Sequence, residues 1–326
     1  MKAIVQDEYG SPDVLRLEEI ERPRLEEGGV LVRVRAACVN PPDVAGVTGV
    51  PYVARTHFGL RRPRTRVRGS DLAGVVEQLG RGVTGLQVGD EVFGDIGPRA
   101  GAFAEVAAAA PEQLAPKPAG LTFEEAAAVP MSGLTALRAL RDVADVRPGQ
   151  KVLVTGAGGG IGSFAVQIAR ALGAEVTGVC SSSKLDLVRS LGAHHVIDYA
   201  REDFTEGAER YDVVLDNVLR HSLTQLVRVV KRDGKLIPNG GQFWKRWTAS
   251  VSVILIKAPL LSLVAPQSIR HVTLAQKRDG LLALTWLLES GEIRPVIGRT
   301  YPLSQTPEAL AHFAEGHARG KLVITI

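Results

Sequence analysis

The pattern of apolar and polar positions divides the chain into two parts. Up to about residue 120, short segments that alternate like β-strands are separated by glycine and proline, whereas longer helical patterns begin at Thr122. The β-like segments of the first part lie at residues 2–6, 30–37, 72–78, 91–94 and 103–107. We therefore expect a small, mostly antiparallel β domain at the start of the chain.

The second part repeats strand and helix units. An alanine-rich helical pattern covers residues 124–128, is interrupted at Pro130 and resumes over 134–141. Apolar segments then predict strands near 151–155, 175–180, 194–198, 211–216 and 234–238, with helices between them. Such alternation indicates a doubly wound parallel sheet with right-handed crossovers. The tail predicts a helix (277–290), a strand, a helix (306–318) and a final strand (321–326), and we expect it to return to the first domain.

Residues 240–267 break the repeat, and we interpret them as a candidate lid or subunit contact. Their apolar stretch, 249–265, contains Lys257 and Pro259 and is shorter than the roughly 20 residues of a membrane-spanning helix. We expect no membrane segment. The first residues lack the basic and apolar regions of a secretory signal, so we expect a cytoplasmic protein.

Composition adds a concentrated positive charge. The 326 residues suffice for two domains, and the formal net charge is +4. Six arginines lie between Arg55 and Arg68. They form either a solvated loop or a surface that attracts an anionic ligand, such as a substrate carried on coenzyme A or on a carrier protein. We expect no nucleic-acid partner, because aromatic residues are not interleaved with these arginines. Two cysteines exclude a disulfide framework.

A glycine-rich turn predicts a dinucleotide site. Residues 152–162 read Val-Leu-Val-Thr-Gly-Ala-Gly-Gly-Gly-Ile-Gly, which is a buried strand followed by glycines and a helical pattern. The strict GxGxxG register fails, and the spacing that fits is Ala157-x-Gly159-x-x-Gly162. The amides that begin the helix would face a pyrophosphate, although an ordinary glycine-rich turn is the alternative. The predicted cofactor contacts here are Ala157, Gly158, Gly159, Gly160 and Ile161.

The residues after the second strand of this unit favour NADP(H). An acidic residue there would bind the ribose of NAD and repel a phosphate, but Glu175 stands at the wrong end of that strand. Ser181, Ser182 and Lys184 instead offer hydroxyl groups and a positive charge to a 2′-phosphate. The alternative is that the serines only cap the helix that follows, and the two roles are compatible.

Two further loops follow parallel strands at their carboxyl ends, where ligands bind in open sheets. We expect Asn217 and Val218 in one loop, and Asn239 and Gly240 in the other, to contact nicotinamide or ribose.

Five motifs in this order resemble the medium-chain dehydrogenase/reductase superfamily. They lie at residues 36–43, 69–76, 88–94, 156–162 and 316–324. Within that superfamily the chain is similar to zinc-independent quinone oxidoreductases and to reticulon-4-interacting-protein-like NADPH-dependent reductases. The resemblance implies an α/β fold with a GroES-like β domain (1–121), a Rossmann NADP(H)-binding domain (122–276), a C-terminal return that completes the first domain (277–326), and a homodimer.

The residue types argue against a metal. A catalytic zinc needs about three Cys, His, Asp or Glu ligands. Asn40 stands where zinc-dependent relatives carry a cysteine, Ser70 and Asp71 replace their His-Glu pair, and no cysteine cluster follows Phe103. Without a Lewis acid, we expect substrates that conjugation already activates: enones, enals, enoyl thioesters or quinones. Hydride would reach the β-carbon and a proton the α-carbon.

The resemblance also assigns individual residues. It implies catalytic roles for Asn40 and Tyr52, and cofactor contacts for Thr135, Tyr199 and Lys321. Tyr52 is as well explained as a loop residue, and Tyr199 as an aromatic packed at a strand end. Asp43 is expected to cap or orient a loop.

One departure from the family is visible. Leu219, Arg220 and His221 follow Val218, where the family usually has a glycine or another small residue, so a bulkier wall would narrow the cleft or alter substrate choice.

Three hypotheses remain open from the sequence. The first is a metal-free NADPH-dependent reductase of a small molecule. The second is a binding or regulatory protein that keeps the nucleotide site without catalysis. The third is a dedicated biosynthetic reductase that acts on a carrier-bound substrate, and it depends on the arginine cluster.

Overall fold

The computed structural model describes residues 1–97, 101–239, 257–262, 265–272, 277–316 and 318–326. Contacts divide the chain into two compact units. Unit 1 comprises Met1–Leu134, Ala275–Ser290 and Pro295–Ile326, and unit 2 comprises Thr135–Leu274 and Gly291–Arg294.

Unit 1 is built on a mostly antiparallel sheet, as the alternating pattern predicts. Its strand order is β14-β15-β3-β4-β5-β7, with β6 paired to β3. Only β14 and β15 pair in parallel among these described strands. Strands β1 (Lys2–Val5) and β2 (Arg16–Glu19) form a separate antiparallel pair. The bounds in the main sheet are β3 Val30–Cys38, β4 Asp71–Leu79, β5 Glu91–Asp95, β6 Val106–Ala109, β7 Leu114–Pro116, β14 Ile297–Pro302 and β15 Lys321–Thr325.

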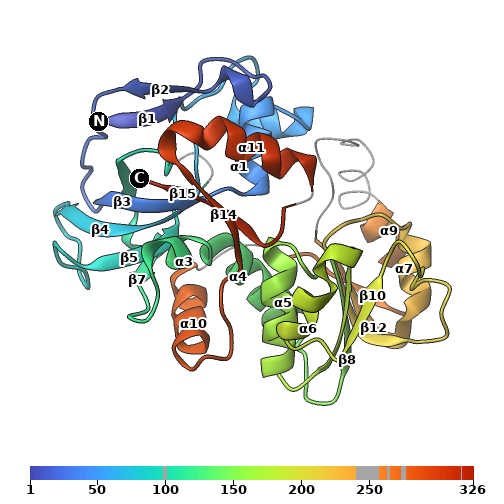
Figure 1. The fold of residues 1–326 in the computed structure, drawn as a ribbon. Coiled ribbons are helices and arrows are strands. Elements are labelled where there is room, and N and C mark those ends of the chain that lie inside the picture. The colour runs from blue at the N-terminus through green and yellow to red at the C-terminus, as the bar shows by residue number, and fades with distance from the viewer. Residues whose placement is uncertain (98–100, 240–256, 263–264, 273–276, 317) are drawn as a thin grey trace. The chain divides into compact units, whose positions relative to one another are not determined.

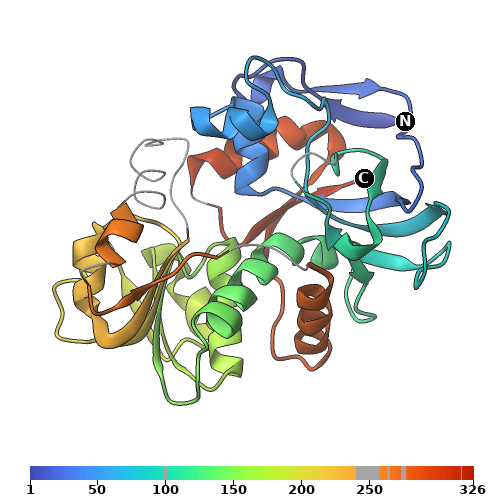
Figure 2. The same ribbon diagram turned by 180° about the vertical axis from the view of Figure 1, so that it is seen from behind.

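The end of the chain completes this sheet. Strand β15 pairs antiparallel with β3, so the red C-terminal strands lie beside the blue N-terminal ones (Figures 1 and 2). The thiol of Cys38, in β3, donates a hydrogen bond of 3.2 Å to the carbonyl of Leu322 in β15. Burial raises the pKa of Cys38 to about 12. Cys38 therefore serves as a small buried hydrophobe rather than as a nucleophile.

Short helices surround the sheet of unit 1. Helix α3 packs on β3, β4 and β15, so unit 1 extends through Leu134, beyond the boundary at residue 121 that we expected. Pro130 does not interrupt a helix. It is the first residue of α4, where its missing N–H has no intrahelical partner to lose. The helices are α1 Pro41–Thr48, α2 Arg55–Phe58, α3 Phe123–Ala127, α4 Pro130–Leu137, α10 Lys277–Glu289 and α11 Thr306–Glu315.

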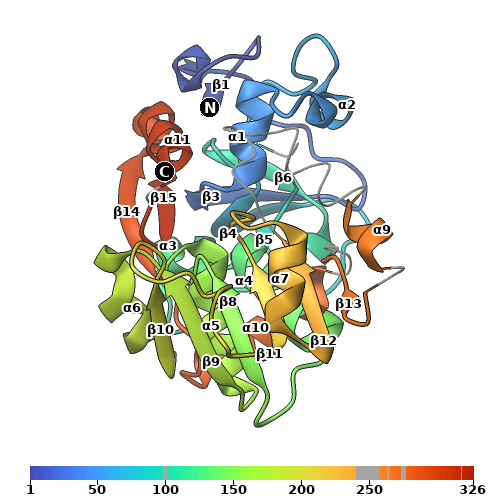
Figure 3. The same ribbon diagram turned by 90° about the vertical axis from the view of Figure 1, so that its right-hand side faces the viewer.

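Unit 2 contains a parallel sheet of order β10-β9-β8-β11-β12-β13, which confirms the doubly wound α/β fold (Figure 3). The strand order reverses between β8 and β11, and such a point opens a crevice at the carboxyl ends of the strands. The strands are β8 Lys151–Thr155, β9 Glu175–Cys180, β10 His195–Asp198, β11 Tyr211–Asp216, β12 Val230–Pro238 and β13 Ser268–Ile269. The helices are α5 Gly160–Ala171, α6 Leu185–Ser190, α7 Leu223–Val229 and α9 Ala258–Ser262.

The segment predicted as a lid or subunit contact is described only at residues 257–262 and 265–267, which include α9. Trp244, Trp247 and the predicted cofactor residue Gly240 lie outside the described residues. Among the helices that the structure describes, none combines the length and the apolar character needed to cross a bilayer.

Candidate cofactor and active site

The glycine turn after β8 leads directly into α5. Gly156 has a φ of 63°, and Gly159 precedes the first helical residue, Gly160. A Cβ atom added to Gly162 would lie 2.1 Å from the carbonyl oxygen of Gly156 and 2.7 Å from the Cα of Ala157. Only glycine permits this close packing, which explains why the spacing counted from Ala157 is the one that fits. The turn presents the positive end of α5, so the residues fit a pyrophosphate.

Lys184 lies against the glycine turn. A Cβ atom added to Gly158 would meet the Cδ of Lys184 at 2.8 Å and its Cβ at 2.9 Å. The fold thus brings the end of β9 and the glycine turn together. A cationic side chain here fits a cofactor that carries an additional phosphate.

The serines beside Lys184 differ in what they can offer a ligand. Ser182 donates a hydrogen bond of 2.6 Å to the Oδ2 of Asp198, so its proton is used within the protein. This bond and the backbone N–H of Ala200 lower the pKa of Asp198. The hydroxyls of Ser181 and Ser183 lie 3.2 Å apart and share one hydrogen bond. Ser182 therefore anchors the loop to β10.

Tyr199 and Arg220 form a contact that sequence analysis missed. Tyr199 follows β10 and is 42% exposed, and the guanidinium carbon of Arg220 lies 5.2 Å from the centre of its ring. His221 adds a contact of 3.2 Å between its Nε2 and the Oδ1 of Asp203. Because β9 and β8 lie between β10 and β11, these contacts join loops from two separated strands. No local pattern in the sequence signals such a pairing.

A chain of hydrogen bonds joins the carboxyl ends of β8, β11 and β12. The hydroxyl of Thr155 donates to the Oδ1 of Asp216 at 2.5 Å. The Nδ2 of Asn217 donates to the carbonyl of Thr155 at 3.0 Å, and the Nδ2 of Asn239 donates to the Oδ1 of Asn217 at 2.9 Å. The structure thus brings Asn217, Val218 and Asn239 to one edge, where nicotinamide or ribose is expected.

Asp216 holds the turn that follows β11. Its Oδ1 also accepts the N–H groups of Val218 and Leu219, at 3.2 and 3.3 Å. Burial raises the pKa of Asp216, and its Oδ2 has no hydrogen-bond partner in the described part of the chain. Leu219 adopts a φ of 53°, which is left-handed and strained for leucine. The position where the family usually has a small residue is therefore one where glycine would be relaxed.

Unit 1 contains a second polar centre, formed around a buried lysine. The Nζ of Lys321 donates to the Oδ1 of Asn40 at 2.5 Å and to the hydroxyl of Ser132 at 3.0 Å. The Nδ2 of Asn40 donates to the Oδ2 of Asp71 at 2.9 Å and to the carbonyl of Cys38 at 3.3 Å. Asn40 and Asp71 are fully buried and Lys321 is 4% exposed. Both amide protons of Asn40 are therefore committed inside the unit.

Two carboxylates tie this centre to helix ends. Asp71 accepts the N–H of Met131 at 3.1 Å, near the start of α4, where a negative charge is favourable. Asp43 accepts the N–H of Asn40 at 2.8 Å in the capping box of α1. Burial raises the pKa of Asp43 to about 7 and that of Asp71 to about 8, although the charge of Lys321 opposes both shifts.

These residues do not fit a zinc ion. An amide, a hydroxyl and a single carboxylate stand at Asn40, Ser70 and Asp71, and the ammonium of Lys321 already occupies the Oδ1 of Asn40. Over the stretches that the structure describes, no three His, Cys, Asp or Glu side chains are grouped so that they could hold a metal.

Two predicted residues remain, Thr135 and Tyr52. Thr135 is 7% exposed in α4. Tyr52, in a single helical turn (Tyr52–Ala54), is 56% exposed, and the guanidinium carbon of Arg55 lies 4.8 Å from its ring centre. Tyr52 can therefore meet a ligand, whereas Asn40 acts through its neighbours.

Comparisons with known proteins give two family models and several similar proteins. A family model described as the alcohol dehydrogenase GroES-like domain matches residues 26–119, and one described as zinc-binding dehydrogenase matches residues 191–324. The chain is 35% identical to 2-methylene-furan-3-one reductase of Solanum lycopersicum, over 99% of this chain and 79% of that protein. It is 32% identical to the NADPH-dependent alkenal/one oxidoreductase of Arabidopsis thaliana chloroplasts, over 99% and 79%.

A mitochondrial relative and a solved structure match the chain over a larger share of their own length. The chain is 32% identical to the mitochondrial NAD(P)H oxidoreductase RTN4IP1 of Mus musculus, over 100% of this chain and 89% of that protein. The quinone oxidoreductase of Coxiella burnetii superposes with a TM-score of 0.87, at 29% identity, over 100% of this chain and 99% of that one.

The strain at Leu219 gives a first prediction. Leu219→Gly and Leu219→Ala both remove the side chain beyond Cβ, but only glycine adopts a φ of 53° without cost. We expect the glycine variant to have the higher free energy of unfolding, by about 1 kcal/mol, in urea denaturation. An alanine variant as stable as the glycine variant would show that the turn is not strained.

The buried carboxylates give a second prediction. In the folded protein the pKa values of Asp43 and Asp71 lie above their ordinary value of 3.8, at about 7 and about 8, so the folded state binds more protons than the unfolded state between these limits. Their contribution to the free energy of unfolding is therefore fully present below pH 3.8 and is lost as the pH rises to about 8.

Asp43→Asn keeps an acceptor for the N–H of Asn40 but does not titrate. We expect urea denaturation at several pH values to show a smaller loss of stability with rising pH for this variant than for the wild type. The exposed Asp13→Asn serves as the control and should leave the slope unchanged. An unchanged slope for Asp43→Asn would contradict the raised pKa.

Proposed function

This chain belongs to the medium-chain dehydrogenase/reductase family, in its quinone oxidoreductase-like branch, and we propose that it is an NADPH-dependent reductase of activated double bonds or quinones. The observation that carries the proposal is the glycine turn after β8 with Lys184 packed against it. Relatives named as reductases of an alkenal/one and of a 2-methylene-furan-3-one support the substrate class, because both names describe a double bond conjugated to a carbonyl.

NADPH would supply a hydride to the β-carbon of such a substrate. The N-terminal amides of α5 bind the pyrophosphate, and Lys184 neutralises the 2′-phosphate. The hydrogen-bonded loops that contain Asn217 and Asn239 hold the nicotinamide end. Positioning of the two reactants in this way supplies a large part of the rate enhancement.

The polar centre of unit 1 is proposed to position the residues that meet the substrate. We assign positioning roles to Asn40 and Lys321, because their polar atoms are used inside the unit. Tyr52 is exposed and has a phenolic proton, so it is the candidate to donate a hydrogen bond to the developing enolate. The mechanism is proposed to be independent of zinc, because Asn40, Ser70 and Asp71 supply an amide, a hydroxyl and one carboxylate rather than a zinc ligand set.

A second candidate function is NADPH binding without catalysis, as in a regulatory protein. The partly buried Leu219 after β11 favours it, since a side chain larger than the small residue usual in the family stands beside the edge where nicotinamide is expected. Turnover of any substrate decides between the two functions.

We also propose a homodimer in the cytoplasm. The resemblance to the quinone oxidoreductase branch supports the dimer. Two buried cysteines without a disulfide suit a reducing compartment, although the relative from Mus musculus is named as mitochondrial. Sedimentation of the purified protein would give the mass of the assembly.

The activity itself is the third prediction. We expect saturable oxidation of NADPH, followed by its absorbance, when the protein is mixed with an enone, an enoyl thioester or a quinone. NADPH binding without oxidation across this panel would favour the regulatory function. Absence of NADPH binding would contradict both.

The choice of cofactor is the fourth prediction. Lys184→Ala should raise KM for NADPH about tenfold, which corresponds to the loss of about 1.4 kcal/mol, and should leave KM for NADH unchanged. The exposed Arg232→Ala, near the amino end of β12, removes one positive charge elsewhere in unit 2 and should change neither value. Equal losses for both nucleotides would show that Lys184 does not recognise the 2′-phosphate.

A further inference from the structure

Residues 55–68 carry an unusual concentration of positive charge. Between Val44 and Ser70 the chain has no Asp or Glu, yet it contains Arg55, Arg61, Arg62, Arg64, Arg66 and Arg68. The structure separates these arginines by what they contact.

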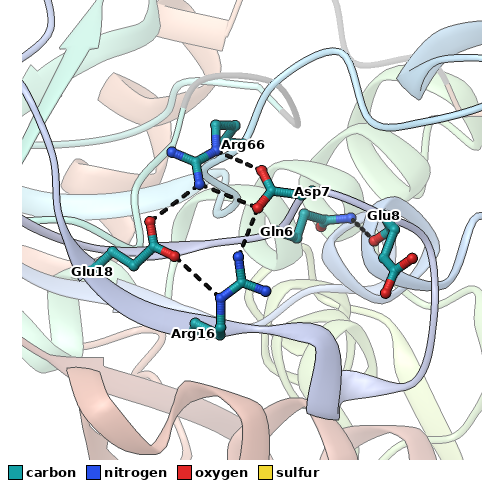
Figure 4. Close-up of polar contacts among 6 residues, drawn as sticks. All are labelled: Gln6, Asp7, Glu8, Arg16, Glu18 and Arg66. Carbon is teal, nitrogen blue, oxygen red and sulfur yellow. Dashed lines mark hydrogen bonds and ion pairs between the residues drawn. The ribbon is translucent and has the colours of Figure 1, made fainter.

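Arg66 is neutralised within the fold. Its Nε lies 2.7 Å from the Oδ1 of Asp7 and its Nη2 lies 3.1 Å from the Oε2 of Glu18. Arg16 contacts the same two carboxylates, so the four side chains form a closed ring of alternating charges (Figure 4). Arg66 thus attaches the segment to β1 and β2, and its charge is not available to a ligand.

Arg68 anchors the segment from inside. It is fully buried, its Nε donates to the Oε1 of Gln6 at 2.9 Å, and its Nη1 donates to the hydroxyl of Thr65 at 3.2 Å. Its Nη2 has no hydrogen-bond partner in the described part of the chain. Gln6 and Thr65 are neutral, so these hydrogen bonds bring no negative charge to Arg68; burial lowers the pKa of Arg68, and Tyr9 and Asp43 oppose that shift.

Three guanidinium groups act on the phenol of Tyr9. Burial raises the pKa of Tyr9, and the positive charges of Arg68, Arg55 and Arg64 oppose that shift. Arg55 donates to the carbonyl of Gly49 at 3.0 Å, and its guanidinium carbon lies 4.6 Å from the ring centre of Tyr9. Tyr9 donates to the carbonyl of Gly59 at 2.6 Å and so has no charge to offer in return.

Three of the arginines are open to solvent, whereas Arg55 is half-buried. Arg61, Arg62 and Arg64 are exposed, and within the part of the chain that the structure describes none of them has an ion-pair partner. Arg55 also stacks on Tyr52, the residue proposed to meet the substrate, and Arg64 shares with Arg55 an electrostatic effect on Tyr9.

We propose that Arg55, Arg61, Arg62 and Arg64, here called the arginine surface, bind the phosphate groups of a coenzyme A thioester while its enoyl group reaches Tyr52. Guanidinium groups pair with phosphate oxygens in bidentate fashion, and a segment that itself carries no Asp or Glu attracts an anion instead of repelling it. The inference rests on the proposed function and selects enoyl thioesters among its substrates.

The test compares a charged thioester with uncharged substrates. The triple variant Arg61→Ala, Arg62→Ala, Arg64→Ala and the wild type are assayed with NADPH on crotonyl coenzyme A, on crotonyl pantetheine, which lacks phosphate, and on a small enone. We expect the triple variant to raise KM for crotonyl coenzyme A at least about tenfold at unchanged kcat. KM for crotonyl pantetheine and for the enone should stay the same. Added salt should raise KM only for crotonyl coenzyme A, because it screens the attraction between charges.

A matched control removes the same charge elsewhere. Arg24, Arg81 and Arg232 are exposed, and the variant Arg24→Ala, Arg81→Ala, Arg232→Ala has the same net charge as the test variant. It should behave as the wild type on all three substrates. Equal changes in KM for both triple variants, or for all three substrates, would overturn the proposal and leave a solvated loop. Sensitivity confined to a crotonyl thioester on a carrier protein would overturn the choice of coenzyme A.

A binding measurement separates this inference from the proposed function. Calorimetric titration of free coenzyme A needs no turnover and should give weaker binding for the test variant than for its control. Such a difference without any NADPH oxidation would remove the proposed function but retain the arginine surface. Turnover of the enone, together with equal binding of coenzyme A by both variants, would keep the proposed function and remove the arginine surface.

Discussion

The ammonium group of Lys321 on the amide of Asn40 is the interaction on which the polar centre of unit 1 depends. A buried cation is costly unless hydrogen bonds replace its water, and Asn40 and Ser132 supply them. Lys321 begins β15, Asn40 follows β3, and Ser132 lies in α4, so one side chain joins three distant segments. Asp71 extends the chain of bonds to the start of α4.

This constraint determines what the centre can do. The amide of Asn40 has no free donor, so chemistry at this place must come from groups that the centre positions rather than from Asn40 itself. The same ammonium stands among the residues that replace zinc ligands. Because a Lewis acid is not expected there, the proposed substrates are ones that conjugation already activates. The proposed nucleotide site in unit 2 is built differently: there the glycine turn and Lys184 supply the groups that bind the anion.

Sequence patterns predicted the elements well where the signal is local. The bounds of β8, β9 and β11 match their predicted segments, because a short apolar segment in an α/β repeat can only be a buried strand. The turn register from Ala157 was also predictable, since Gly162 leaves no room for a Cβ. Lys321 and Asn40 are 281 residues apart, and no periodicity signals that their side chains meet. The stacking of Arg220 on Tyr199 and the division of the arginines into anchored and exposed members depend in the same way on tertiary contacts.

The most direct test of this account is kcat for Lys321→Met with an enone, measured beside the dissociation constant for NADPH on the same preparation. If Lys321 keeps the substrate-binding residues of unit 1 in position, its replacement lowers kcat by about a hundredfold, because a displacement near 1 Å is enough for such a loss. The dissociation constant for NADPH stays the same, which also shows that unit 2 is folded. A Lys321→Met enzyme that binds NADPH and keeps the kcat of the wild type would contradict the account.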